Sequence, residues 1–299
     1  GADAVELALT DAGITWGDVQ IAFGGSWEAA QTDPLTGLLG LDGIPFMNVF
    51  NARATGAATI TNATNAIKLG VADIAVAVGM DKHGRGAFRF DPTLVNMPHW
   101  YADNGQYTTT KFFGMKINRY MHDHGITSAT LAKVVNKNTR NGVLNEKAFR
   151  REELSEEKVL GGAMLNFPLT QYMFCAPDEG AAAVVLCRAD KAHEYTDKPI
   201  FVKSTKIQSR NYGAYEVNTS WAAVDEDVAP TVYASRAAYE EAGVGPEDVD
   251  VVQLQDTDAG AEIINLAENG FCADGEQEKL YADGSLEITG SLPVNTDGG

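Results

Sequence analysis

Hydrophobic positions along the chain predict helices that alternate with buried strands, which is the pattern of an α/β protein. The clearest segment begins with an extended run at 46–50 and turns through small residues at 52–56. A helix rich in alanine is predicted at 57–69, and a buried strand at 74–78. Small side chains let such a helix pack closely against its neighbours, so we expect this segment at the centre of the fold.

The same reasoning predicts the remaining elements. Helices are expected at 3–12, 27–41 (interrupted at Pro34), 111–124, 128–141, 152–159, 231–242 and 259–266. Strands are expected at 21–23, 179–187, 200–210 and 249–254, with an extended tail at 290–294. The run at 179–187 is apolar or small throughout and predicts a fully buried strand. Two stretches lack periodicity, as functional loops often do. The stretch 83–110 is rich in glycine, proline and aromatic residues, and 210–230 is rich in aromatic residues.

One short pattern occurs twice. Residues 11–23 (DAGITWGDVQIAF) match residues 241–253 (EAGVGPEDVDVVQ), with Asp18 against Asp248 at an offset of 230 positions. Each copy predicts a helix end, a glycine, a short turn and a strand. Two copies so far apart indicate a duplicated α/β fold.

Composition and charge exclude several function classes. No apolar run reaches about 18 residues, so no membrane span is expected. The net charge of −18 argues against binding to nucleic acid or an anionic membrane surface. The three cysteines, Cys175, Cys187 and Cys272, are widely spaced, which is typical of reduced thiols in a cytoplasmic protein. Neither these cysteines nor the histidines have the spacing of metal ligands, so no metal site is predicted.

Several motifs resemble the thiolase superfamily, and within it the sterol-carrier-protein type. The run NVFNARATG at 48–56, with its small-residue helix and the strand ending in GMDK, resembles the nucleophile segment of that family. Further resemblance lies in FCAPDEGAAAVVL at 174–186, in DVDVVQLQDTDAGAEI at 248–263, and in the insertion-like segment 131–170. VNTDGG at 294–299 resembles the approach to the family's Gly-His-Pro loop.

The resemblance implies a fold and a domain organisation. We expect the thiolase fold, a duplicated architecture of five layers, α-β-α-β-α, with both ends of the fold outside this sequence. Residues 1–190 would form the N-terminal half, with an insertion at about 83–166, and residues 199–299 a truncated C-terminal half.

Two positions depart from the family pattern. Arg53 stands where the family has its nucleophilic cysteine, and Gln255 stands where the second motif has histidine. A guanidinium cannot be acylated or act as a base at neutral pH, and an amide cannot transfer a proton. We therefore expect the covalent thiolase route to be closed. Arg53 could pair with Asp256, contact substrate or fill the vacated pocket.

One branch of the superfamily lacks the cysteine, namely the lipid-transfer-protein-like aldolases that cleave steroid side chains. Resemblance to it implies retro-aldol cleavage of a 17-hydroxy steroid CoA thioester to a 17-ketosteroid and propionyl-CoA. It also implies a partner with an OB-fold and a zinc ribbon, and a homodimer within a heterotetramer. No cofactor is implied, because coenzyme A is part of the substrate.

Such a reaction needs a base for the hydroxyl, a donor to the enolate oxygen and an acid to protonate the enolate carbon. Tyr215 is the first candidate for the base because it lies in a segment without periodicity, and Tyr212 is the second; Tyr101 and Tyr107 are further alternatives. The remaining candidates follow a predicted strand end, where α/β proteins often bind ligands: Gln255 as donor and Asp256 as acid or base. Asp258 reads as a helix N-cap.

Two other functions remain open from the sequence. The chain could be a non-catalytic scaffold subunit that binds acyl-CoA, or an atypical acetyl-CoA acyltransferase with an unusual residue. Basic side chains at 133, 137, 140, 150 and 151 could meet CoA phosphates, although a solvated helix face explains them equally well.

Overall fold

The computed structural model describes residues 1–29, 31–84, 86, 91, 93, 99–105, 108–209 and 228–299. The chain forms two compact units. Unit 1 comprises Gly1–Arg85 and Pro177–Ile207, and unit 2 comprises Gly86–Ala176 and Gln208–Gly299. Segments distant in sequence thus share each unit. The two thiolase-like halves, 1–190 and 199–299, stay a prediction.

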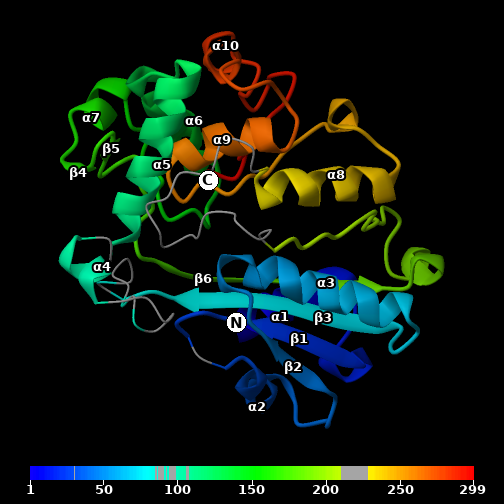
Figure 1. Cartoon of the computed structure of the whole chain (residues 1–299). Coiled ribbons are helices and arrows are strands. Elements are labelled where there is room, and N and C mark those ends of the chain that lie inside the picture. The colour runs from blue at the N-terminus through cyan, green and yellow to red at the C-terminus, as the bar shows by residue number, and fades with distance from the viewer. Residues whose placement is uncertain are drawn as a thin grey trace. The chain divides into compact units, whose positions relative to one another are not determined.

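Unit 1 is built around one sheet. Its helices are α1 (Ala2–Ala12), α2 (Thr36–Leu39) and α3 (Thr55–Lys68), with short 3-10 helices at Trp16–Asp18, Asp33–Leu35, Ala52–Ala54 and Ala189–Glu194. Its strands are β1 (Ile21–Gly25), β2 (Phe46–Val49), β3 (Ile74–Lys82) and β6 (Glu179–Cys187). They lie in the order β2-β1-β3-β6, with β1 parallel to both neighbours and β6 antiparallel to β3 (Figure 1).

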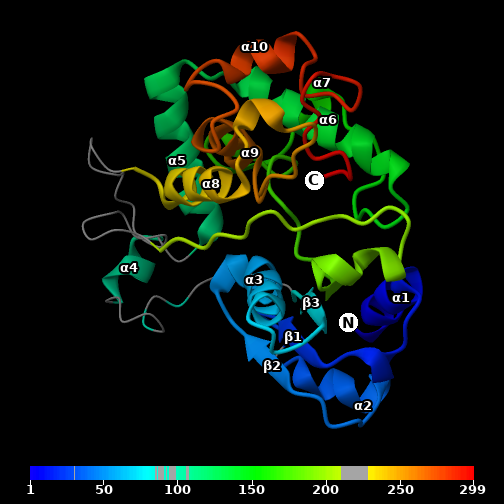
Figure 2. The ribbon, with the colours of Figure 1, turned by 90° about the vertical axis from the view of Figure 1, so that its right-hand side faces the viewer.

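Alternation along the strands gives the sheet two apolar faces. Phe23, Ala75 and Ala77 pack with Ala63 and Ala66 of α3 on one face. The next residues in register face the other way, and there Val76 and Val78 pack with Val5 and Leu9 of α1. Figure 2 shows α3 and α1 on opposite sides of the strands. The predicted elements at 3–12, 21–23, 46–50, 57–69 and 74–78 are therefore confirmed, with small shifts at their ends.

Three expectations in unit 1 were wrong. The strand at 179–187 is not fully buried, because β6 is the edge of the sheet and its first residues, Glu179 to Ala182, are exposed. No strand forms at 200–209, although Ile200, Phe201 and Val202 have the composition of one. Between 27 and 41, the described residues form two short helices, Asp33–Leu35 and Thr36–Leu39, in place of a longer helix interrupted at Pro34.

Unit 2 is mainly helical. It contains α4 (Trp100–Asp103), α5 (Thr109–His124), α6 (Ser128–Leu144), α7 (Glu156–Leu160), the two-stranded pair β4 (Met164–Asn166) and β5 (Leu169–Thr170), α8 (Pro230–Ala242), α9 (Ala259–Glu268) and α10 (Gln277–Ala282). The core joins α5, α6 and α9 through Ile117, Leu131, Val134, Ile263 and Leu266. α6 begins as expected, with the side chain of Thr127 accepting a hydrogen bond from the amide of Thr130. The acidic helix expected at 152–159 is limited to α7.

The two copies of the repeat adopt the same local structure. α1 and α8 each end at a glycine in the left-handed conformation, Gly13 with φ 67° and Gly243 with φ 69°. A 3-10 turn follows in each, and its aspartate accepts a hydrogen bond from the amide three residues earlier. The distances are 2.8 Å from Thr15 N to Asp18 Oδ2 and 2.9 Å from Gly245 N to Asp248 Oδ2. The first copy then enters β1.

The second copy leads into a chain that was expected to be a strand at 249–254. Among the described residues this segment forms only an isolated parallel bridge, between Val252 and Val294. The tail from 290 likewise forms no ladder among the described residues beyond this bridge, and side chains of α6 hold it by donating to the carbonyls of Val294 and Asn295. Within the described ranges, no helix is long and apolar enough to cross a membrane.

Candidate active site

The candidate site lies where the chain passes from the Val252 bridge into α9, within unit 2. Leu254 donates its amide hydrogen to Asn295 Oδ1 at 2.8 Å, which fixes the end of the extended segment. Asp258 then caps α9, since its Oδ1 accepts from the amides of Gly260 at 2.9 Å and Ala261 at 3.1 Å. The N-cap expected at Asp258 is confirmed. Gln255 and Asp256 occupy the turn between these two anchors.

Asp256 is the residue of this turn with the most perturbed chemistry. Burial raises the pKa of its carboxyl to about 7, and the negative charge of Glu262 adds to the increase, while Lys137 opposes it. Asn138 of α6 donates from Nδ2 to Asp256 Oδ2 at 3.1 Å. A carboxyl with a pKa near 7 can both hold and release a proton at neutral pH, as a general acid or base must.

Beneath Asp256 lies a buried polar network centred on Glu262, which is fully buried in α9. Its Oε1 lies 2.9 Å from Lys137 Nζ and accepts the hydroxyl hydrogen of Tyr281. Its Oε2 accepts from Asn138 Nδ2 and from Asn295 Nδ2, each at 2.7 Å. Four donors therefore satisfy a charge that burial alone would strongly destabilise.

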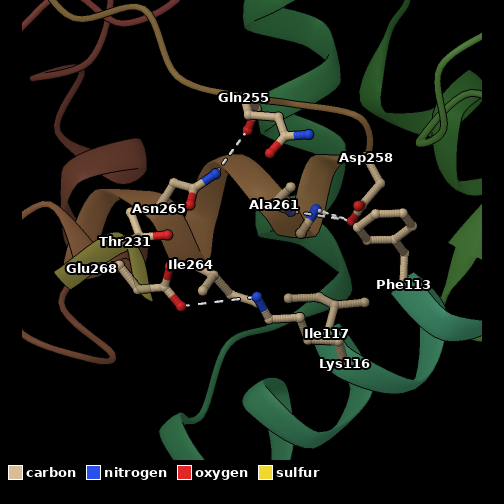
Figure 3. A pocket seen from close by; sticks show the side chains of 11 residues that line it. Phe113, Lys116, Ile117, Thr231, Gln255, Asp258, Ala261, Ile264, Asn265 and Glu268 are labelled. Carbon is tan, nitrogen blue, oxygen red and sulfur yellow. Dashed lines mark hydrogen bonds and ion pairs between the residues drawn. The ribbon is translucent and has the colours of Figure 1, made fainter. Parts of the chain in front are cut away.

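Gln255 is exposed and lines a pocket of about 100 Å³ on the opposite side of α9's first turn. Figure 3 shows Phe113, Ile117, Asp258 and Asn265 around the same space. The side chain of Asn265 donates to the backbone oxygen of Gln255 at 3.0 Å, which leaves the Gln255 amide directed away from this contact.

Asp258 also lines this pocket. Burial raises the pKa of its carboxyl to about 6, against the lowering effect of the amide hydrogen bonds at the start of α9. Its Oδ2 is buried and has no hydrogen-bond partner among the described residues. Its role at the helix start is structural.

Known proteins resemble this chain over nearly its whole length. The thiolase C-terminal domain-like family matches residues 216–299, which include the turn and α9. The acetyl-CoA acetyltransferase of Methanothermobacter thermautotrophicus is 31% identical to this chain, over 98% of the chain and 77% of that protein. The chain belongs to the thiolase family.

Other thiolase-family proteins indicate the branch. Sterol carrier protein 2 of Bos taurus is 27% identical over 99% of the chain and 57% of that protein. The 17-hydroxy-3-oxo-4-pregnene-20-carboxyl-CoA lyase of Mycobacterium tuberculosis is 27% identical over 100% of the chain and 80% of that protein. A solved Ltp2-ChsH2(DUF35) aldolase covers 100% of this chain and 78% of its own, with a TM-score of 0.87 at 24% identity. The expected thiolase fold and sterol-carrier-type branch are confirmed.

Arg53, the residue expected at the position of the thiolase nucleophile, lies in unit 1. It belongs to the 3-10 turn before α3, where Ala52 has a positive φ of 47° and its carbonyl accepts the Thr55 hydroxyl hydrogen at 2.6 Å. The exposed guanidinium lies over the ring of Trp27, 5.8 Å from its centroid. The turn before α3 thus presents a cation, and its equivalence to the thiolase nucleophile turn stays a prediction. Pairing of Arg53 with Asp256 stays a prediction.

The thiol of Cys175, beside the turn, is a poor nucleophile at neutral pH. The amide of Cys175 donates to the Thr257 carbonyl at 2.9 Å, which places this residue beside the turn. Burial raises the pKa of the Cys175 thiol to about 11, although Arg150 opposes the increase. The thiolate, which is the nucleophilic form, is therefore scarce at neutral pH.

The tyrosines proposed as bases cannot be placed. Tyr215, Tyr212 and Tyr107 lie outside the described residues, as does the side chain of Tyr101. Among the residues that the structure describes, no cluster of three histidine, cysteine or acidic side chains could hold a metal ion.

The basic side chains considered for CoA phosphates do not share one environment, since Arg151 is exposed and Lys133 is half-buried. Lys137 is buried, with 2% of its surface exposed. Arg140 contacts Glu287, and Arg150 donates to the backbone oxygens of Tyr172 at 3.2 Å and Phe174 at 2.8 Å. These three side chains have structural partners within unit 2.

Sequence reasoning missed the network residues. They are Lys137 as an ion-pair partner, Asn138, Glu262, Tyr281 and Asn295. One signal was available, because Glu262 lies on the apolar face of α9 formed by Ala259, Ile263 and Leu266. A charged residue on such a face predicts a buried partner, but the sequence does not say which cation supplies it.

Proposed function

We propose that this thiolase-family protein is a carbon–carbon lyase that cleaves the side chain of a 17-hydroxy steroid CoA thioester by a retro-aldol reaction. The products would be a 17-ketosteroid and propionyl-CoA. The observation that carries the proposal is the Asp256 carboxyl, whose pKa of about 7 lies in the turn where the thiolase histidine is replaced by Gln255. The turn therefore still carries a group that can exchange a proton at neutral pH, although the cysteine and histidine of the covalent route are replaced.

The chemistry fits the residues that are present. The base removes the proton of the 17-hydroxyl, the carbonyl forms, and the adjacent carbon–carbon bond breaks. Its electron pair enters the thioester as an enolate, and an acid protonates the enolate carbon. No bond to the enzyme is formed, so neither a cysteine at position 53 nor a histidine at position 255 is required.

We assign the roles as follows. Tyr215 acts as the base for the hydroxyl, with Tyr212 as the alternative, and a neighbouring cation would bring its pKa closer to neutrality. The Gln255 amide donates a hydrogen bond to the enolate oxygen. Asp256 protonates the enolate carbon, since burial holds its proton up to neutral pH. Such positioned donors and acids typically contribute about 10²–10⁴-fold each.

The names of two relatives support two different activities, a lyase and an acyltransferase. The Mycobacterium tuberculosis relative is named as a steroid CoA lyase, whereas the Methanothermobacter relative is named as an acetyl-CoA acetyltransferase. We favour the lyase because Arg53 cannot be acylated and the pKa of Cys175 is about 11. A non-catalytic acyl-CoA scaffold remains the second candidate, favoured by the same loss of catalytic residues.

We further propose that the protein works in the cytoplasm as a homodimer, joined by an OB-fold and zinc-ribbon partner in a heterotetramer. The solved structural neighbour is an Ltp2-ChsH2(DUF35) aldolase, a name that joins two components and supports a partner. No cofactor is needed beyond the CoA of the substrate. A monomeric mass at micromolar concentration, with and without the partner, would contradict the assembly.

The test is a product assay on the full protein, alone and with the partner. A 17-hydroxy steroid bearing a three-carbon side-chain CoA thioester is incubated, and the products are separated by chromatography and weighed by mass spectrometry. We expect equal amounts of 17-ketosteroid and propionyl-CoA, and no thiolysis of acetoacetyl-CoA. A stable acyl adduct on the protein would support the acyltransferase, and substrate binding without turnover would support the scaffold.

A further inference from the structure

Asn138 makes three polar contacts, each directed at a charged or titratable side chain. It lies on α6 and is buried, with 7% of its surface exposed. Its Oδ1 accepts from Lys137 Nζ at 2.6 Å, and its Nδ2 donates to Glu262 at 2.7 Å and to Asp256 at 3.1 Å. Both hydrogens and the oxygen of the amide are therefore used.

These contacts fix the orientation of the amide. An ammonium can only donate, so it requires the Oδ1 side. A carboxylate oxygen accepts, so Glu262 requires the Nδ2 side. The buried ion pair between Lys137 and Glu262 thus determines which way Asn138 points, and the second Nδ2 hydrogen is left directed at Asp256.

The ion pair is itself held in place. Lys137 Nζ also donates to the Val294 carbonyl at 2.7 Å, and Glu262 accepts from Asn295, whose Oδ1 in turn anchors Leu254 at the start of the turn. Asn295 has a positive φ of 51°, a conformation that asparagine tolerates better than most residues. The network therefore reaches Asp256 from both α6 and the extended segment.

We propose that Asn138 is a positioning residue, oriented by the Lys137–Glu262 pair, that fixes the Asp256 carboxyl for proton transfer. This deepens the proposed function and rests on it, because that function gives Asp256 its role. If Asn138 were only structural, its side-chain amide would be expected to form hydrogen bonds with backbone groups of a helix or loop. Here the recipient of the second Nδ2 hydrogen is a side-chain carboxyl, that of Asp256, at 3.1 Å.

Several charged or titratable groups face Asp256, so a change in its titration must be interpreted against all of them. They are Lys137 of α6, Glu262 of α9, Tyr281 of α10, Arg150, Cys175 and Asp297. A hydrogen bond from Asn138 favours the ionised form of Asp256, which lowers its pKa against the effect of burial. Removing that donor should therefore raise the pKa further.

The experiment follows the Asp256 carboxyl by carbon NMR in protein labelled at aspartate, with Asp256→Asn used to assign the signal. In Asn138→Ala the titration midpoint should move up by about half a pH unit or more. Asn136→Ala is the matched control, because Asn136 donates to the Leu154 backbone at 2.9 Å and should leave the midpoint unchanged. An unchanged midpoint in Asn138→Ala overturns the proposal.

A second measurement uses the unaltered protein and does not depend on the variant folding. The side-chain amide hydrogens of Asn138 should shift with pH at the midpoint of Asp256, whereas those of Asn136 should not. Absence of this coupled titration overturns the proposal.

Kinetics then separate this inference from the proposed function. If the protein is a lyase, Asn138→Ala should lower kcat about tenfold or more with KM within about twofold, because orientation and not binding is lost. If no cleavage is found in any variant, the proposed function fails, while the NMR result still decides whether Asn138 controls Asp256.

Discussion

Lys137 Nζ and Glu262 Oε1 lie 2.9 Å apart, and both side chains are almost completely buried. The pair joins α6 to α9 inside unit 2, where the low dielectric makes an unpaired charge costly. Removing either side chain should therefore lower the stability of the fold strongly, because the remaining charge is left buried and unpaired.

The first prediction concerns this pair. Lys137→Met should lower the free energy of unfolding by about 3–5 kcal/mol, because Glu262 is left as a buried charge without its cation. Denaturant unfolding followed by circular dichroism measures the change. Lys133→Met, on the same helix and only half-buried, is the control and should cost no more than about 0.5 kcal/mol. An equal decrease in the free energy of unfolding in the two variants would show that the buried ion pair does not contribute more than a half-buried lysine.

The second prediction concerns pH. Burial raises the pKa of Asp256 from 3.8 to about 7, so the folded state keeps a proton that the unfolded state has already lost. The folded protein therefore loses stability through this group as pH rises from about 4 to about 7. Asp256→Asn removes the effect and should stabilise the protein at pH 8 by at least about 1 kcal/mol more than at pH 4.5.

Unfolding curves at several pH values check this expectation. Asp250→Asn removes the same charge at an exposed position and corrects for the high net negative charge of the chain. If the two variants differ from the parent by the same amount at every pH, the raised pKa of Asp256 is refuted.

The sequence predicted the structures that depend on residues close together in the chain, and it failed for those that depend on contacts between distant segments. Local patterns were sufficient for α3, β3, α6 and α9, and for the two repeated turns, because spacing and capping residues lie within a few positions of each other. They failed at 200–209, where apolar residues predict a strand but cannot supply a neighbouring strand to bond with. They failed at β6 because edge position is a property of the whole sheet.

The candidate site was predicted in part for the same reason. Gln255, Asp256 and Asp258 were identified because they follow one another after a strand-like segment. Asn138 and Asn295 were missed, since they approach the turn from other parts of the chain. Lys137 was grouped with basic residues that could meet CoA phosphates or form a solvated helix face, because the helix pattern does not reveal that Glu262 would be buried opposite it.

The third prediction concerns Arg53. Arg53→Cys should not restore acetoacetyl-CoA thiolysis, because the residue at the histidine position is Gln255, which cannot activate a thiol. A coupled assay for acetyl-CoA, with an authentic thiolase as positive control, measures this. Appreciable thiolysis by the single variant would mean that the covalent route is still available, and would count against the lyase.

The fourth prediction concerns Tyr215. Tyr215→Phe should lower the rate of side-chain cleavage about 10²–10⁴-fold, because the tertiary hydroxyl loses its base, while folding and partner binding are retained. Tyr212→Phe is the matched comparison in the same segment. A rate within about threefold of the parent for Tyr215→Phe would transfer the role to Tyr212 or Asp256.

The central claim is that carbon–carbon cleavage passes through a thioester enolate that the enzyme protonates, and cleavage in D₂O tests it most directly. The substrate is the 17-hydroxy steroid CoA thioester, and propionyl-CoA is collected and weighed by mass spectrometry. The account predicts one deuterium at the carbon next to the thioester in each propionyl-CoA, formed in equal amount with the 17-ketosteroid. Propionyl-CoA without deuterium, or a protein-bound acyl group with no ketosteroid, would contradict it.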